Sequence, residues 1–235
     1  MSKDSHVVTQ SAIARLCEWC DGTVIREINK MMTLILGGSG SGKSAFAENY
    51  LLRAVADKRK LDKKEYKKYY IATMQIWDAE MQAKVDRHHR LRQGKGFTTI
   101  EQPVALEKAL EMMREIQSVA ALLECMSNLV ANEMFSVEYN SMEYNSMEYN
   151  SMDTQENGLT VTERVLQGVE ALKSQADPFV IVTNNVFEDG ITYDSSTMEY
   201  IETLGRINER LAAEADEVIE VVAGIPQWIK QADAV

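Results

Sequence analysis

Cysteine and proline are scarce in this chain, with three of each among 235 residues. Three cysteines are too few for the disulfide framework of a small secreted domain, which indicates a reducing environment. No stretch reaches the ~18 consecutive apolar residues that a membrane-spanning helix needs. The first residues, "MSKDSHVVTQ", also lack the basic-then-apolar order of a signal peptide. We therefore expect a cytoplasmic protein without a membrane span.

Basic residues are outnumbered, with 25 against 36 acidic residues and a formal net charge of −11. Such a surface repels a phosphate backbone, so we expect no nucleic-acid partner. Any anionic ligand has to be held by a local pocket instead. Hydrophobic residues make up 45% of the chain, and a chain of this length can bury the core of one α/β domain.

Short apolar, β-branched runs alternate with longer amphipathic segments along the chain. The predicted strands are Thr33–Leu36, Lys68–Thr73, Phe97–Glu101, Ala120–Glu124, Phe179–Thr183 and Glu217–Ala223. The predicted helices are Ser44–Asp57, Asp78–Arg92, Val104–Ser118, Cys125–Phe135, Thr160–Ser174 and Thr197–Ala213. Runs such as "FVIVT" are typical of strands covered on both faces. The pattern predicts an α/β fold, a doubly wound and mainly parallel sheet with helices on both faces.

Two segments lie outside this alternation. Residues 1–30 precede the first predicted strand, and we expect them to be an N-terminal extension, with Met31 or Met32 as a candidate start of translation. Residues 138–152 read "EYNSMEYNSMEYNSM". A period of five matches neither a helix nor a strand, so we expect a low-complexity surface loop at about 136–157. The prediction is a single α/β domain over residues 31–235.

The stretch "ILGGSGSGKS" fits the phosphate-binding pattern G-x-x-x-x-G-K-[ST]. Its members are Gly37, Gly38, Ser39, Gly40, Ser41, Gly42, Lys43 and Ser44. Glycines allow backbone N–H groups to converge on phosphate oxygens, and the following helix adds partial positive charge. We expect Lys43 to reach the β- and γ-phosphates and the Ser44 hydroxyl to bind Mg²⁺. Strand, loop and helix follow in the required order, which predicts a nucleotide-binding, P-loop NTPase-type domain.

A second candidate lies in "KVDRHHRLR", on the helix predicted to begin at Asp78. At helical spacing, Met81, Val85, His88 and Arg92 share one stripe, whereas His89 is rotated away from it. One interpretation is a helix that lines a phosphate site, with the imidazole as nucleophile and Arg92 neutralising charge. A histidine buried for structural reasons is an equally good interpretation of the spacing.

Several unusual motifs occur in a fixed order. They are "ILGGSGSGKS", "YYIATMQIWDAEM", "KVDRHHRLR", "LLECMSNLVAN", "VIVTNNV" and "GRINERLAAEADEVIEVVAGIPQWIK". In this order they resemble the bifunctional adenosylcobinamide kinase / adenosylcobinamide-phosphate guanylyltransferase family of cobalamin biosynthesis. The resemblance covers Met32 to Lys230. It implies that the chain phosphorylates adenosylcobinamide with GTP or ATP, and then transfers GMP from GTP to adenosylcobinamide phosphate through a histidine–GMP intermediate.

The resemblance also implies site residues. The family's guanylylated histidine follows an "R-I-x-x-H" element, which falls on His88, with His89 as the alternative register and Arg92 one turn beyond. The implied nucleotide contacts are Gly37 to Ser44, Ala72, Thr73, Met74, His89, Arg90, Leu91, Arg92, Glu101 and Glu124. The implied catalytic residues are His88, Lys43 and Arg92, with Mg²⁺ at Ser44. Family members are trimers, so a homotrimer is expected.

The chain departs from the family pattern after the fifth predicted strand. It reads "TNNVFEDGITYD", with Asn185 and Phe187 where the family has an acidic residue and a glycine, and "MEYIETLG" replaces an arginine-rich element. These departures leave open an enzyme with the guanylyltransferase half-activity alone. Two further alternatives are a non-catalytic P-loop nucleotide-binding protein and another P-loop small-molecule kinase in which His88 has no role.

Overall fold

The computed structural model describes residues 30–76, 78–113, 118–135, 159–186, 190–191 and 193–231. The predicted extension up to residue 29 and the predicted loop at about 136–157 lie outside the described residues. Within the described part of the chain, no helix is long and apolar enough to cross a membrane.

The described elements alternate between strands and helices for most of the chain. The strands are β1 (Met32–Leu36), β2 (Tyr66–Ala72), β3 (Phe97–Glu101), β4 (Ser118–Glu124), β5 (Phe179–Val182), β6 (Glu217–Val222) and β7 (Ile225–Lys230). The helices are α2 (Lys43–Asp62), α3 (Ala79–Arg92), the 3₁₀ turn η1 (Leu106–Lys108), α4 (Ala109–Met112), α5 (Met126–Phe135), α6 (Val161–Gln175) and α7 (Ser195–Glu214).

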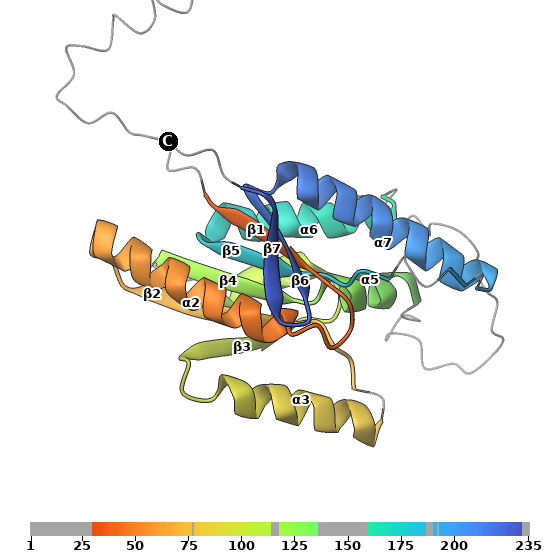
Figure 1. The fold of residues 1–235 in the computed structure, drawn as a ribbon, viewed down its shortest axis with the longest axis horizontal. Coiled ribbons are helices and arrows are strands. Elements are labelled where there is room, and N and C mark those ends of the chain that lie inside the picture. The colour runs from red at the N-terminus through yellow and green to blue at the C-terminus, as the bar shows by residue number, and fades with distance from the viewer. Residues whose placement is uncertain are drawn as a thin grey trace, which may run out of the picture.

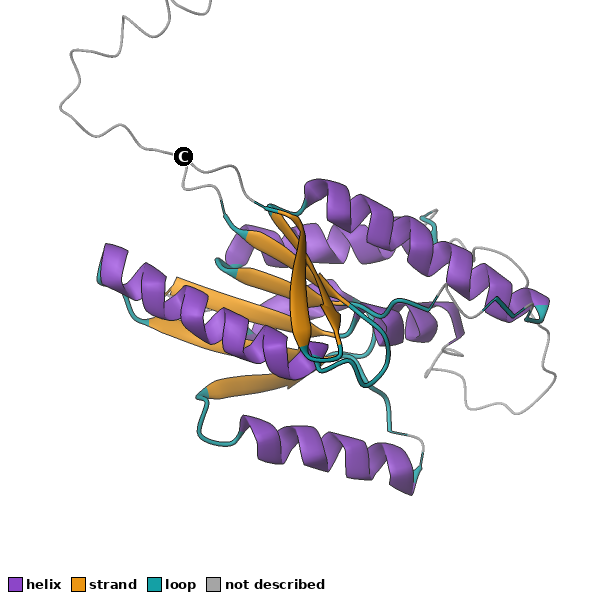
Figure 2. Cartoon of the chain, viewed as in Figure 1, coloured by secondary structure: helices purple, strands orange, loops and turns teal. Residues whose placement is uncertain are grey.

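All seven strands form one sheet, in the order β3-β2-β4-β5-β1-β6-β7 (Figure 2). The pairs from β3 to β6 are parallel, and only β7 is antiparallel to its neighbour β6. The chain leaves β1 near the middle of the sheet and continues at β2, several positions away. Ligands of open α/β sheets bind at such a crossover, beyond the carboxyl ends of the strands.

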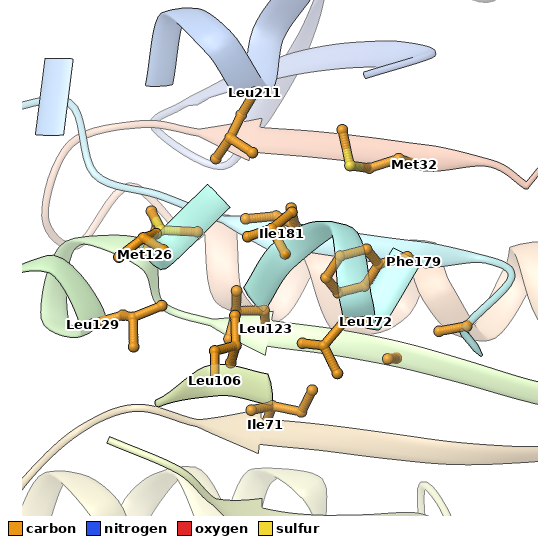
Figure 3. Close-up of a cluster of buried hydrophobic side chains, with 14 of the residues drawn as sticks. Met32, Ile71, Leu106, Leu123, Met126, Leu129, Leu172, Phe179, Ile181 and Leu211 are labelled. Atoms are coloured by element: carbon orange, nitrogen blue, oxygen red, sulfur yellow. The ribbon is translucent and has the colours of Figure 1, made fainter. Parts of the chain in front are cut away.

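Helices cover both faces of the sheet (Figure 1). On one face, α4 to α7 pack over the larger core cluster, which includes Leu172 and Leu211. In Figure 3, Phe179 and Ile181 of β5 point into this cluster between the helices. On the other face, α2 packs Ala47 and Leu51 against the second core cluster. The prediction of a mainly parallel α/β sheet with helices on both faces is confirmed.

The predicted helix over 104–118 is too long: only residues 106–112 are helical among the described residues of this segment. Its place is taken by η1 and the short α4, and Ser118 already belongs to β4, where it pairs with Tyr66 of β2. Ala105 has a φ of 50°, in the left-handed region, and its N–H donates to the Glu133 carboxylate over 2.7 Å. Strand pairing and this long-range hydrogen bond therefore override a local helical pattern.

Strand β7 was not predicted at all. Its sequence, "IPQWIK", contains Pro226, which lacks the N–H that an interior strand requires. At the sheet edge this is tolerated, because among the described strands β7 has a neighbour, β6, on one side only. Ile225, Trp228 and Ile229 of this edge strand are exposed.

Candidate active site

The loop between β1 and α2 is built as the phosphate-binding motif predicts. Gly42 lies just before α2 with a φ of 91°, and Lys43 opens the helix. The Lys43 ammonium group donates to the carbonyl of Gly38 over 3.0 Å, so the side chain folds back over its own loop. Only 7% of Lys43 is exposed. Burial lowers the pKa of Lys43, and the nearby Glu124 carboxylate opposes this effect.

The turn between β6 and β7 braces this loop from behind. A Cβ atom on Gly37 would lie 2.5 Å from the carbonyl oxygen of Val221, so the strand approaches too closely for any side chain there. The N–H of Gly224 donates to the carbonyl of Ser41 over 2.8 Å. The loop is therefore held in place by β6 and by the turn that follows it.

Ser44 and Glu124 meet where a metal ion is expected. The Ser44 hydroxyl donates to Oε1 of Glu124 over 2.6 Å, while the buried Oε2 atom has no hydrogen-bond partner among the described residues. Burial raises the pKa of Glu124 to about 7, despite the opposing Ser44 hydrogen bond and the Lys43 charge. A hydroxyl and an unsatisfied carboxylate oxygen fit a hard divalent cation such as Mg²⁺.

No cluster of three or more His, Cys, Asp or Glu side chains able to hold a metal lies in the described residues. A cation at Ser44 and Glu124 would therefore take its remaining ligands from water and nucleotide phosphates, as Mg²⁺ commonly does.

Three predicted residues form a row across the carboxyl ends of neighbouring strands. Ala72 of β2 is in register with Glu101 of β3 on one side and with Glu124 of β4 on the other. Glu101 is exposed at this edge. The predicted carboxylates thus lie at the end of the sheet that the phosphate loop occupies.

Thr73 and Met74 continue from that row. Thr73 is fully buried, and its hydroxyl donates to the carbonyl of Cys125 and accepts from the Cys125 N–H, both over 2.8 Å. This side chain therefore locks the end of β2 to the end of β4, a structural role, while Met74 is half-buried beside it.

Helix α3 carries the predicted nucleophile and is anchored at its C-terminal end. Among its described side chains only Arg92 is buried, with its guanidinium carbon 3.6 Å from the centre of the Tyr70 ring. His88, one turn earlier, is half-buried. Burial and the Arg92 charge lower the pKa of His88, so its imidazole is neutral at pH 7.

The rest of the predicted segment faces solvent or is not described. His89 and Arg90 are exposed, and the side chain of Leu91 lies outside the described set. Burial therefore distinguishes the two adjacent histidines, and it favours His88 as the residue in the site.

A pocket of about 370 Å³ opens on the opposite side of the phosphate loop, toward β6. It is lined by Gly38, Ser39, Gly40, Ser41, Asn185, Glu220, Val221, Val222 and Ala223. Asn185, a departure from the family pattern, donates its N–H to the carbonyl of Gly37 over 3.1 Å. The departure thus lies directly against the phosphate loop. Phe187, the other named departure, lies outside the described residues.

Sequence reasoning missed Glu48 of α2, which is only 3% exposed and forms an ion pair with Lys95. One signal was present: Glu48 is a charged residue one turn after Ser44, on the stripe that otherwise buries Ala47 and Leu51. Its partner is 47 residues away, which no local pattern reveals.

Comparison with known proteins agrees with the geometry. The model of the family described as "Cobinamide kinase / cobinamide phosphate guanyltransferase" matches residues 33–229. The bifunctional adenosylcobalamin biosynthesis protein CobU of Escherichia coli is 30% identical over 200 residues, which covers 85% of this chain and all of that protein. CobU of Salmonella typhimurium is 30% identical over 205 residues with the same coverage.

A third relative is more distant. The bifunctional adenosylcobalamin biosynthesis protein CobP of Pseudomonas aeruginosa is 25% identical over 203 residues, 85% of this chain and 98% of that protein. Among solved structures, the ATPase domain of G40P superposes with a TM-score of 0.39 at 10% identity, over 82% of this chain and 69% of that one. That likeness is too loose to support a conclusion. The match of the family model over nearly the whole described chain decides the matter: the chain belongs to the cobinamide kinase / cobinamide phosphate guanyltransferase family, and is a transferase.

Proposed function

We propose that this chain catalyses both reactions of its family at the carboxyl edge of the sheet. First, it phosphorylates the aminopropanol hydroxyl of adenosylcobinamide with GTP or ATP. Second, it transfers GMP from GTP to the resulting phosphate through a covalent intermediate on His88, which gives adenosyl-GDP-cobinamide. The observation that carries this proposal is a half-buried imidazole, neutral at pH 7, one turn before Arg92. The charge of Arg92 acts on Glu124, the carboxylate that is hydrogen-bonded to Ser44 of the phosphate loop.

In the first reaction, the hydroxyl oxygen bonds to the γ-phosphorus as the bond from that phosphorus to its bridging oxygen breaks. The nucleoside diphosphate leaves, and the hydroxyl proton passes to solvent. Lys43 and the backbone N–H groups of the loop bind the phosphate oxygens and neutralise their charge. Ser44 and Glu124 would hold Mg²⁺, which when bound would neutralise negative charge on the phosphates.

In the second reaction, a nitrogen lone pair of His88 bonds to the α-phosphorus of GTP, and pyrophosphate leaves. A phosphate oxygen of the acceptor then bonds to the same phosphorus while the P–N bond breaks and returns its electron pair to His88. Arg92 lies one turn from His88 and stacks on Tyr70, so its charge is fixed where negative charge develops. A neutral imidazole is the competent nucleophile here.

The test uses GTP labelled at its α-phosphate. Purified protein is incubated with this GTP and Mg²⁺, denatured, and examined for an acid-labile, base-stable label. We expect label in wild type and in His89→Ala, and none in His88→Ala. His89 is exposed and adjacent to the half-buried His88, so His89→Ala serves as a matched control.

Each other outcome has a distinct meaning. Loss of label only in His89→Ala would move the intermediate to His89. Absence of label in every form, with corrinoid present, would contradict the guanylyltransferase reaction and leave a P-loop kinase or a nucleotide-binding protein. Separate assays of the two half-reactions test whether the kinase step survives the change at Asn185. The predicted homotrimer is tested by analytical ultracentrifugation.

A further inference from the structure

We propose that Glu48 is a positioning residue that ties helix α3 to the phosphate-loop helix and supports the charge that forms on His88. The role in catalysis rests on the proposed function of His88, whereas the tie between the helices does not. Nothing in the predicted site included Glu48 or its partner Lys95.

The placement of Glu48 is unusual for an acidic residue. It lies on α2 one turn after Ser44, and only 3% of it is exposed. The buried neighbours on the same helix stripe, Ala47, Leu51 and Val55, pack into the apolar core. An ionised carboxylate in such a position is costly unless it is paired. A leucine would fill this position at no such cost, so the acid calls for an explanation beyond packing.

Its partner is Lys95, in the turn that follows α3. The Lys95 ammonium group donates to Oε2 of Glu48 and is 27% exposed on its side chain. The backbone N–H of Lys95 donates to the carbonyl of Arg92 over 3.0 Å, so Lys95 is part of the turn that ends α3. The ion pair therefore joins the first turns of α2 to the last turn of α3.

Few other contacts of helix α3 are seen among its described side chains. Arg92 is the one buried residue among its described side chains, and its contact is the stacked ring of Tyr70. Two polar contacts, Arg92 on Tyr70 and Lys95 on Glu48, thus fix the end of the helix that carries His88. A polar anchor of this kind positions a side chain relative to the phosphate loop without a large apolar interface.

Glu48 also acts on His88 through its charge. The charged and titratable groups that face His88 are Arg92, Arg87, His89 and Glu48. Burial and the first three lower the pKa of His88, and Glu48 alone raises it. When a nitrogen of His88 bonds to phosphorus, the ring becomes positively charged until its other N–H proton leaves. Glu48 is the negative charge positioned to stabilise that state.

The first test measures the His88 imidazole itself and needs no activity. The chain has only three histidines, so an NMR titration with ¹³C-labelled histidine resolves His88 once His88→Ala identifies its signal. We expect the pKa of His88 to fall in Glu48→Gln and to rise in Arg92→Met. Asp57→Asn, which removes a charge from an exposed position of the same helix, is expected to leave it unchanged. An unchanged pKa in Glu48→Gln overturns the electrostatic part of the proposal.

The second test measures the rate at which label from α-labelled GTP enters the protein. We expect Glu48→Gln and Lys95→Met to form the intermediate at least about tenfold more slowly, the effect of one pKa unit of lost interaction, while Asp57→Asn matches wild type. Lys95→Met retains the Glu48 charge, so it isolates the tie between helices if Glu48→Gln fails to fold. If Lys95→Met forms the labelled intermediate at the wild-type rate, the proposed tie between the two helices is contradicted.

The two proposals fail in different ways. If wild type takes up no label, the function of His88 is contradicted, while the titration still decides whether Glu48 acts on the imidazole. If wild type is labelled, and Glu48→Gln shows the same His88 pKa and the same labelling rate as Asp57→Asn, the role of Glu48 is contradicted and that of His88 stands.

Discussion

Helices α2 and α3 lie on the same face of the sheet, yet they are held in opposite ways. Helix α2 crosses the sheet (Figure 1). It buries Ala47, Leu51 and Val55 in the core. Helix α3 lies beyond it near the edge strand β3 (Figure 1), and its one buried side chain among those described is the polar Arg92. The phosphate loop is thus braced by β6 and the turn after it, at Gly37 and Ser41, whereas the contacts described for the helix that bears His88 are polar.

The difference separates two tasks. Phosphate binding requires backbone N–H groups at fixed positions, which a loop wedged between core strands provides. In the proposed function, His88 has to reach a phosphorus atom and then pass GMP to a second substrate. The predictions below test the two sides of this comparison.

The largest effect is expected on the α2 side, from Lys43→Met. The variant keeps the length of the side chain and removes its charge from a nearly buried site. We expect phosphoryl transfer to fall by ~10²–10³-fold, the usual cost of one charge-stabilising group. The control is Lys60→Met, an exposed position of the same helix. A loss below about threefold would contradict the role of Lys43 at the phosphates.

The next effect concerns Glu124 and the pH dependence of stability. Its pKa is raised from 4.5 to about 7 in the folded protein, so between these values the unfolded state gives up a proton that the folded state keeps. Wild-type stability therefore decreases as pH rises from 4.5 to 7, by roughly 3 kcal/mol in all, and then levels off.

Glu124→Gln removes this titration. The measurement is chemical denaturation at several pH values in the presence of a chelator. We expect the free energy of unfolding of the variant, relative to that of wild type, to increase as pH rises to 7. A constant difference across that range would show that Glu124 keeps an ordinary pKa in the folded protein.

The smallest of the three effects concerns the brace behind the phosphate loop. Gly37→Ala places a Cβ 2.5 Å from the Val221 carbonyl oxygen, whereas Gly38→Ala places one in open space. We expect Gly37→Ala to lower the free energy of unfolding by about 1–3 kcal/mol and Gly38→Ala to change it by less than about 0.5 kcal/mol. Equal losses in the two variants would contradict the brace. Urea denaturation measures both.

Sequence patterns sufficed for the parts of the molecule that depend on local order. The parallel strands from β1 to β6 and the phosphate loop were predicted because apolar runs and the G-x-x-x-x-G-K-[ST] spacing are local signals. Helical spacing also placed His88 and Arg92 on one stripe. Helical spacing did not decide whether this stripe packs in the core or lines a site, because the burial of each side chain depends on the three-dimensional fold.

The failures share one physical cause, contacts between residues far apart in sequence. The segment 104–118 has a helical pattern, yet the N–H of Ala105 donates to Glu133, and Ser118 belongs to β4, which pairs with β2. Strand β7 is defined by its antiparallel pairing with β6. The Glu48–Lys95 ion pair joins two segments whose proximity is created by the fold.

The central claim is that one site uses a core-bound phosphate loop and a polar-anchored histidine. The most direct test isolates protein labelled from GTP, removes free nucleotide, maps the modified peptide by mass spectrometry, and then adds adenosylcobinamide phosphate. We predict that GMP is attached to His88 and that it passes completely to the added acceptor. GMP on any other residue, or a His88 adduct that the acceptor does not discharge, would contradict the account.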